Sequence, residues 1–270
     1  MKYRNLNSNP NHRSTARIAT ITILWAIFAL TMAACTAPTK PAETQASETS
    51  RAAGANSPSQ AANSAVNSSS PSGDPAGTYS VSGAGADGKN YQGEVVVTKR
   101  DQVHQMSWKI GAENYDGIAV QSGNTLAAAY TTGTNGKGCG AVVYKINADN
   151  SLDGKWGEWG VNSSGTEKAV PAGELSGSVG TFNVSGTNAD GSAYKGKLTI
   201  TKGNNDTYQF AWDTGTKFIG TGVKKGEYLA AGSGAKQCGF VIYEVKGDTL
   251  EGKWGVPGSD ALGTEKATKR

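Results

Sequence analysis

Residues 77–270 carry one pattern twice, and this duplication restricts the possible folds more than any other feature of the chain. The matching segments keep the same order in both copies: 77–83 with 180–186, 105–108 with 209–212, 139–140 with 238–239, 154–157 with 252–255, and 165–168 with 263–266. A period near 100 residues is the size of an independent domain and is too long for a solenoid repeat. The sequence therefore predicts two tandem domains, at residues 77–170 and 171–270.

Apolar and polar side chains alternate within each copy. Tyr194, Leu198 and Ile200 share one face of their segment, and lysine and threonine side chains occupy the other. This period of two is typical of antiparallel strands with one buried face. About seven or eight strands are expected in each copy, and in the first they lie near residues 77–83, 91–99, 104–110, 114–121, 124–131, 139–146, 151–157 and 165–169.

Glycine and proline usage supports the same fold class. Residues 77–270 hold 35 of the 37 Gly and only two of the eight Pro, which suits short strands joined by tight turns. The dipeptides at 87–88 and 190–191 are Asp-Gly, which favours hairpin turns with positive φ. We predict an all-β protein with two small antiparallel up-and-down (meander) β-barrels, because closure removes exposed sheet edges. A β-sandwich is the alternative.

The first 34 residues have the pattern of an export signal. A basic segment is followed by an uncharged stretch of 17 residues from Ile18 to Ala34. The sequence Met-Ala-Ala-Cys at 32–35 resembles a bacterial lipobox, which implies cleavage before Cys35 and acylation of that residue. The alternative is an ordinary signal peptide with an incidental Cys. Thr36 in place of Asp implies, by the sorting rules of such lipoproteins, the outer membrane or cell surface of a bacterial envelope.

Residues 36–76 form the remainder of the segment between the signal and the repeats. They are almost exclusively Ala, Ser, Asn, Thr, Pro and Gln, with Val66 as the only large aliphatic residue. Such a composition cannot bury enough apolar surface to offset its ordering entropy. We expect residues 35–76 to be a disordered linker that tethers the repeats to a lipidated Cys35.

Net charge bears on the class of partner. Four of the 26 Lys and Arg lie in the first 34 residues, which leaves 22 to balance 22 Asp and Glu. A neutral chain argues against nucleic acid as a partner, since phosphate binding needs clustered positive charge.

A resemblance rests on motifs shared by both copies. The run from Gly-Thr-Tyr at 77–79 through Ala-Asp-Gly at 86–88, Cys-Gly at 139–140 and Gly-Lys-Trp at 154–156 to Gly-Thr-Glu at 165–167 resembles repeats of bacterial secreted proteins often described as fibronectin-binding. The resemblance covers nearly all of residues 77–270. It implies binding or adhesion, and it supplies no binding residues. We expect no cofactor.

Few residues suggest catalysis. His104 is the only His after the leader and has no counterpart in the second copy, so it is expected to be an exposed strand residue. Glu167 and Glu265 recur, but no second repeated acid accompanies them as a paired-carboxylate hydrolase would require. A structural role for each Glu, bonded to backbone amides or a Lys, is the stronger interpretation.

Cys139 and Cys238 occupy equivalent positions, and export would place both in an oxidising compartment. Three alternatives remain open: two buried thiols, one disulfide joining the two domains, or two reactive thiols. If Tyr144 and Tyr243 point into the barrels, the strand alternation turns both Cys residues outward. We hypothesise that these outward faces pack together and bring the sulfurs within bonding distance.

Trp159 is the tryptophan without a matching partner, since Pro257 stands at its position in the second copy. Core packing is the stronger interpretation, and an exposed anchor for a glycan or peptide is the alternative. The loop from Tyr130 to Gly138, which includes Asn135, is longer than its counterpart. Trp159, Tyr130 and Asn135 are therefore the candidate binding residues.

These observations together predict a lipid-anchored envelope protein that acts as a non-enzymatic binding or adhesion module. The expected partners are the membrane, through the N-terminal lipid, and an extracellular protein or glycan. Two linked copies could bind a repetitive partner with avidity. The alternatives are an envelope scaffold or a protease-inhibitor-like barrel, and less favoured is a hydrolase.

Overall fold

The computed structural model describes residues 73–133, 135–234, 238–259 and 261–270, and these fold entirely into β-structure. The predicted signal peptide, Cys35 and most of the predicted linker lie outside the described residues. Within the described ranges, the strands form two closed antiparallel barrels of eight strands each. The all-β class and the barrel architecture are therefore confirmed, and the sandwich alternative is not. Among these residues we find no helix of the length and apolarity needed to cross a membrane.

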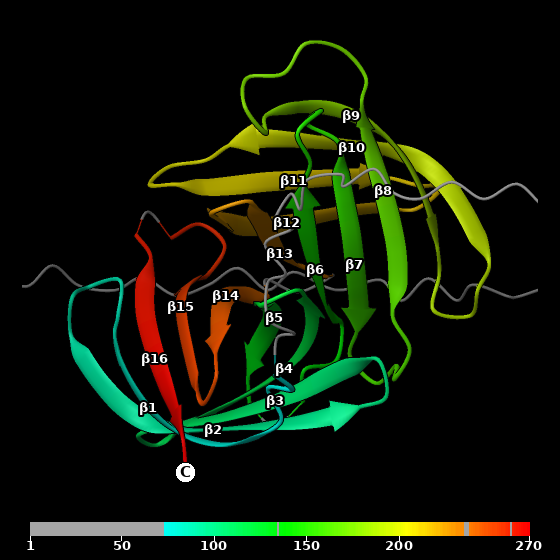
Figure 1. The fold of residues 1–270 in the computed structure, drawn as a ribbon. Helices are drawn as coiled ribbons and strands as arrows, with labels where there is room; N and C mark the ends of the chain where they lie inside the picture. The colour runs from blue at the N-terminus through cyan, green and yellow to red at the C-terminus, as the bar shows by residue number, and fades with distance from the viewer. Residues whose placement is uncertain (1–72, 134, 235–237, 260) are drawn as a thin grey trace, which may run out of the picture. The chain divides into compact units, whose positions relative to one another are not determined.

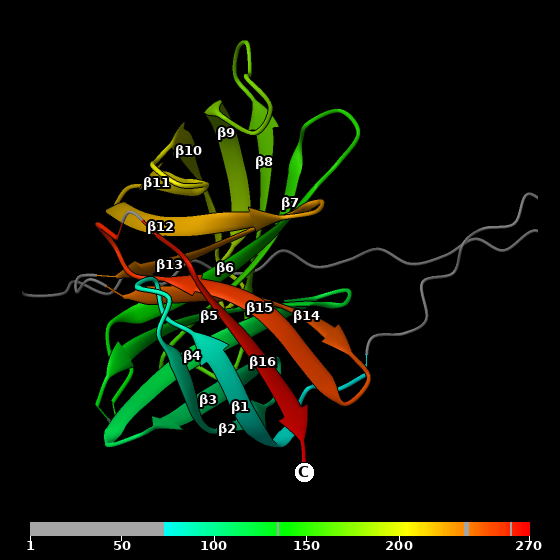
Figure 2. The same cartoon turned by 90° about the vertical axis from the view of Figure 1, so that its left-hand side faces the viewer.

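Barrel A, which surrounds the first of two separate interior cores, has the order β1-β16-β15-β14-β5-β4-β3-β2 (Figures 1 and 2). Its strands are β1 (Gly77–Ala84), β2 (Asn90–Arg100), β3 (Val103–Ile110), β4 (Glu113–Ser122), β5 (Thr125–Thr132), β14 (Gly239–Lys246), β15 (Thr249–Gly255) and β16 (Gly263–Lys269).

Barrel B surrounds the second interior core and has the order β10-β11-β12-β13-β6-β7-β8-β9. Its strands are β6 (Cys139–Ile146), β7 (Leu152–Glu158), β8 (Gly165–Pro171), β9 (Gly180–Thr187), β10 (Ala193–Lys202), β11 (Thr207–Asp213), β12 (Lys217–Lys225) and β13 (Tyr228–Gly234).

Each barrel takes strands from both sequence copies. The first copy supplies β1–β5 to barrel A and β6–β8 to barrel B, and the second copy supplies the complementary sets. The exchange is made by β5 pairing with β14 and by β6 pairing with β13. The expectation that residues 77–170 and 171–270 each close their own barrel is thus corrected: the boundary separates the repeats but not the barrels.

Local structure follows the sequence pattern closely. The eight strands of the first copy begin and end within two residues of the predicted positions. Both Asp-Gly dipeptides form turns, with φ of 77° at Gly88 and 85° at Gly191, in the left-handed region that glycine tolerates. Each turn is also closed by its Asp, since Asp87 Oδ1 accepts from the Lys89 amide at 3.0 Å and Asp190 Oδ1 from the Ser192 amide at 2.9 Å.

A third apolar core lies between the barrels and is made of outward-facing side chains. Its largest members include Val103, Ile118, Tyr228, Phe240 and Ile242, all of them buried. Strands β3–β6 and β12–β14 therefore have apolar residues on both faces, as buried strands do. This interface explains why the outward side of β14 carries Phe240 and Ile242 rather than polar residues.

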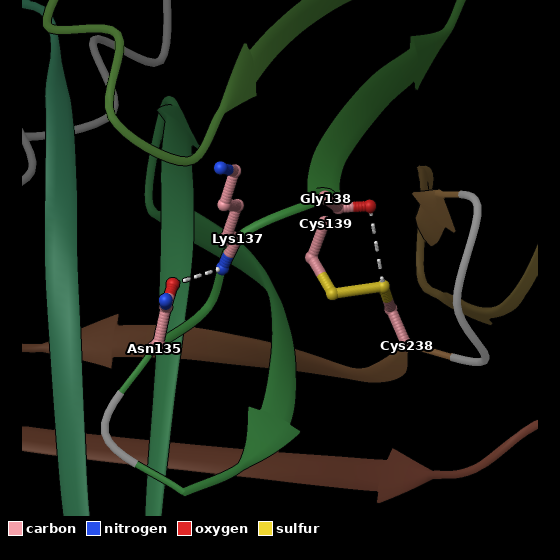
Figure 3. Close-up of a disulfide and its surroundings, with 5 residues drawn as sticks. All are labelled: Asn135, Lys137, Gly138, Cys139 and Cys238. Carbon is pink, nitrogen blue, oxygen red and sulfur yellow. Dashed lines mark hydrogen bonds between the residues drawn. A yellow bond between two sulfur atoms is a disulfide. The ribbon is translucent and has the colours of Figure 1, made fainter.

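A disulfide joins Cys139 and Cys238 at the edge of this third core (Figure 3). Their Cα atoms are 5.9 Å apart, and both residues are at most 2% exposed. Of the three alternatives for this pair, the structure has the disulfide, and the outward faces pack together as hypothesised. The bond links the start of β6 in barrel B to the residue before β14 in barrel A, which are the two strands that exchange.

Candidate functional site

The interior of barrel A opens into a cavity of about 510 Å³ at the end where the β1–β2 turn lies. Six of its lining residues are aromatic: Tyr91, Trp108, Tyr115, Tyr130, Tyr243 and Trp254. The rim carries Asp87 and Lys89, which pair with each other at 2.8 Å. A concave, largely apolar site with a few polar groups is the usual form of a ligand pocket.

Glu265 lies at the inner end of this cavity and is 7% exposed. One carboxylate oxygen accepts hydrogen bonds from Tyr243 Oη and, at 3.2 Å, from Trp108 Nε1; the other accepts from Tyr91 Oη at 2.9 Å. Trp254 Nε1 in turn donates to Tyr91 Oη at 2.8 Å. Every donor to Glu265 is thus a neutral aromatic side chain.

Barrel B repeats the arrangement around Glu167, which is 5% exposed. Tyr144 Oη donates to Glu167 at 2.5 Å and Tyr194 Oη at 2.9 Å. Trp212 Nε1 reaches the same carboxylate at 3.3 Å, and Trp156 Nε1 donates to Tyr194 Oη at 3.1 Å. The cavity above this network is smaller, at about 260 Å³.

Both networks depend on the strand exchange. In barrel A, Tyr91 and Trp108 come from the first copy, whereas Tyr243, Trp254 and Glu265 come from the second. In barrel B the contributions are reversed. Neither copy could assemble a network of this composition from its own described strands without re-pairing them.

Burial shapes the ionisation of these groups. Removal from water raises the pKa of the Glu265 carboxyl, and the hydrogen bonds from Tyr243, Tyr91 and Trp108 oppose this shift without cancelling it. The pKa of Glu167 is raised for the same reason. Burial also raises the pKa of Tyr243 and Tyr144, so both phenols stay protonated and able to donate.

Glycines of neighbouring strands provide the space for these aromatic rings. A β-carbon at Gly263 would lie 2.3 Å from Cε2 of Trp254, and one at Gly165 would lie 2.1 Å from Cε2 of Trp156. Tyr91 is packed in the same way against Gly83. The repeated glycines therefore accommodate the aromatic side chains of the networks.

The three predicted binding residues lie in two places. Tyr130 lines the barrel A cavity, where its ring packs against Trp108 at 5.7 Å and Tyr115 at 5.9 Å between centroids. Asn135 is exposed in the β5–β6 loop, and its Oδ1 accepts from the Lys137 amide at 2.8 Å (Figure 3). Trp159 packs against the core between the barrels, with its ring directly over Gly136. The structure thus brings Trp159 to the loop, but not to either cavity.

Two other expectations need correction. His104 was expected to be exposed, but it is buried, with 5% of its surface exposed, and this burial lowers its pKa. Its Nε2 lies 3.3 Å from Asp74 Oδ1, in the segment before β1. The partners of Glu167 and Glu265 are tyrosines and tryptophans rather than backbone amides or a Lys. The signal for these networks was present in the sequence, because each of their residue types recurs at matched positions in both copies.

Comparison with known proteins identified no relative: no family model, no curated protein and no solved structure matches this chain. The site must therefore be interpreted from its own chemistry. Among the described residues, no group of three or more His, Cys, Asp and Glu side chains is placed to hold a metal ion. Each cavity instead combines aromatic walls with one buried carboxylate whose oxygens are already hydrogen-bonded, an arrangement suited to holding a ligand in place.

Proposed function

We propose that this protein is a non-enzymatic binding module whose two barrel cavities each receive one group of an extracellular protein or glycan. The observation that supports this most directly is the duplication of the same cavity, with the same Glu, Tyr and Trp residues at its inner end. A network kept solely for stability would not require an open cavity above it. Two equivalent sites on one chain favour a repetitive partner, since the second binding event becomes intramolecular.

The geometry of Glu265 supports binding rather than catalysis. Three donors hold its two oxygens, and its hydrogen-bond capacity is largely used by the protein. A carboxylate held in this way serves as a fixed negative charge. A general base would instead need a free oxygen that can take up a proton from a substrate and release it again. We therefore propose that the activity is recognition.

Blocking each cavity tests this proposal. Thr132 is exposed at the rim of the barrel A cavity, and Thr216 is exposed at the rim of the barrel B cavity. We expect the double variant Thr132→Trp/Thr216→Trp to lose retention on immobilised extracellular-matrix proteins and glycans that retain the wild-type protein. The matched control is Thr268→Trp, on the exposed side of β16. Equal retention of all three proteins would refute the assignment of the sites to the cavities.

We further propose that the barrels are tethered to the bacterial envelope by acyl chains on Cys35. The support is the lipobox-like sequence at 32–35 and the low-complexity segment that follows it. Metabolic labelling with a fatty acid should mark the wild-type protein and the Cys139→Ala variant, but not Cys35→Ala. Labelling of Cys35→Ala would contradict the anchor.

A further inference from the structure

The charge of Glu265 has no cationic partner among the described residues. No Lys, Arg or His in that part of the chain forms an ion pair with it, although the carboxylate is 7% exposed. The one cationic side chain among the residues that line the cavity, Lys89, is already paired with Asp87. Buried carboxylates are normally paired with a positive charge, because neutral donors only partly replace hydration. Glu265 therefore provides negative charge at the inner end of the cavity that a bound cation could neutralise.

The walls of the barrel A cavity specify the kind of cation. Six aromatic side chains line it, and the faces of such rings attract cations. The hydroxyls of Tyr91 and Tyr243 donate to Glu265 and also accept from the indole N–H groups of Trp254 and Trp108, so little of their acceptor capacity is left for a ligand. A primary ammonium carries three N–H groups that each need an acceptor, whereas a quaternary ammonium needs none. The lining thus favours a methylated ammonium over a primary one.

Barrel B is an internal comparison for this argument. It keeps the Glu, the two Tyr and the two Trp of the network. In barrel A, however, the residue opposite Trp108 on the next strand is Tyr115, whereas in barrel B the residue opposite Trp212 is Phe218. Ser233 takes the place that Tyr130 has in barrel A, and the cavity has about half the volume. An aromatic enclosure is therefore more complete in barrel A.

We propose that the barrel A cavity binds a quaternary ammonium group, enclosed by Trp108, Tyr130 and the neighbouring aromatic rings, with Glu265 as its counter-charge. This assignment rests on the proposed function and names the chemical group that the cavity recognises. The shared chemistry is the trimethylammonium group, carried either by a small free molecule or by a methylated lysine side chain of an extracellular protein.

Calorimetric titration of the full chain with matched probes tests the assignment. Choline and 3,3-dimethylbutan-1-ol have nearly the same shape, but only choline is charged. We expect choline to bind at least tenfold more tightly, and Nε-trimethyl-lysine to bind at least tenfold more tightly than lysine. Tighter binding of choline than of trimethyl-lysine would indicate a small free molecule as the source of the group, and the reverse order would indicate a methylated lysine side chain. Equal binding of choline and its neutral analogue, or of lysine and its methylated form, would overturn the proposal.

Variants locate the binding to barrel A. Tyr130→Ser introduces the residue that barrel B tolerates at this place, and Glu265→Gln removes the charge while keeping an oxygen acceptor. Each should weaken choline binding at least tenfold, whereas the control Thr268→Trp, on the exposed side of β16, should leave it unchanged. Denaturant unfolding of each variant verifies that it is folded.

The two proposals can fail separately. If choline does not bind, yet retention on an immobilised ligand is still abolished by Thr132→Trp, the cation assignment is wrong and the cavity remains the binding site. If the double variant Thr132→Trp/Thr216→Trp changes nothing, the proposed function of the two cavities is wrong.

Discussion

Single residues in this protein act through close packing between aromatic rings and glycine. Trp254 occupies space that any side chain at Gly263 would fill, and Tyr91 lies equally close to Gly83. These rings in turn orient the donors that reach Glu265. A change of one methyl group at such a position therefore alters both the core and the inner end of the cavity.

Gly263→Ala should lower the free energy of unfolding by roughly 1–3 kcal/mol, because the new methyl group overlaps the indole of Trp254. Gly140→Ala is the matched control, since a β-carbon there would lie no closer than 3.3 Å to its neighbours. Urea unfolding followed by tryptophan fluorescence measures both. Equal destabilisation by the two substitutions would contradict the packing argument.

The two buried glutamates should make stability depend on pH in a defined direction. Their pKa values are raised in the folded protein, so folding favours the protonated form. As pH falls through the folded pKa toward the ordinary value of 4.5, the wild-type protein should gain stability relative to Glu167→Gln/Glu265→Gln. Urea unfolding of both proteins between pH 8 and pH 4 checks this. A difference that does not vary with pH would refute it. His104 is present in both proteins, so its titration largely cancels in the comparison.

Individual strands have two different kinds of environment. The outer faces of β3–β6 and β12–β14 pack in the core between the barrels, whereas β1, β2, β15 and β16 contribute no buried residue to that core. Strand β6 begins at Cys139 and β14 directly follows Cys238, so the disulfide lies where the chain enters the second barrel in each copy. The bond therefore restrains the elements whose pairing creates both cavities.

Removing the disulfide should destabilise the protein substantially. The sequence separation between Cys139 and Cys238 is 99. A cross-link that closes a loop of this length strongly reduces the number of conformations open to the unfolded chain. We expect Cys139→Ala/Cys238→Ala to lower the free energy of unfolding by roughly 2–4 kcal/mol. Dithiothreitol should shift the urea midpoint of the wild-type protein toward that of the variant and leave the variant unchanged. A midpoint that is the same in all four conditions would show that the bond contributes little.

Trp159 should behave as a packing residue and not as a ligand anchor. Its ring covers Gly136 and contacts the core between the barrels while remaining partly exposed. Trp159→Ala should therefore lower the free energy of unfolding by roughly 1–3 kcal/mol, less than for a fully buried tryptophan. Retention on an immobilised ligand should not change under conditions where the variant is folded. Loss of retention by the folded variant would instead support the exposed-anchor alternative.

In the described structure as a whole, neither sequence copy forms a complete barrel alone. An isolated first copy would lack β16 beside β1, β9 beside β8, β14 beside β5 and β13 beside β6. It would also expose the apolar outer faces of β3–β6, which the second copy covers. Both deficits would be removed if two identical copies associated as the two halves of this chain do.

A protein comprising residues 77–175 should therefore form a dimer, with Cys139 bonded to Cys139 of the other molecule. The reason is that association supplies the four missing strand neighbours and covers the apolar faces. Sedimentation velocity gives the mass, and non-reducing electrophoresis detects the bond. A stable monomer with intact near-ultraviolet circular dichroism would show that one copy closes its own barrel.

Much of this structure follows from short-range features of the sequence. The period of two placed the strands, the Asp-Gly pairs placed two turns, and the phase of Tyr144 and Tyr243 indicated that both Cys residues face outward. Local steric preferences and the alternation of side chains decide these features, and both are visible in a few consecutive residues.

Which strands close which barrel was decided only by tertiary structure. The two copies offer β5 nearly equivalent partners in β6 and β14, and the six residues between Thr132 and Cys139 are enough for a hairpin. Exchange nevertheless pairs β5 with β14 and buries the outward apolar faces against each other. The cavities and their Glu networks followed from that choice, because each combines residues more than 20 positions apart and, in barrel A, up to 174 apart. Local patterns carry no information on such pairing, whereas the burial of a shared apolar face depends on the whole chain.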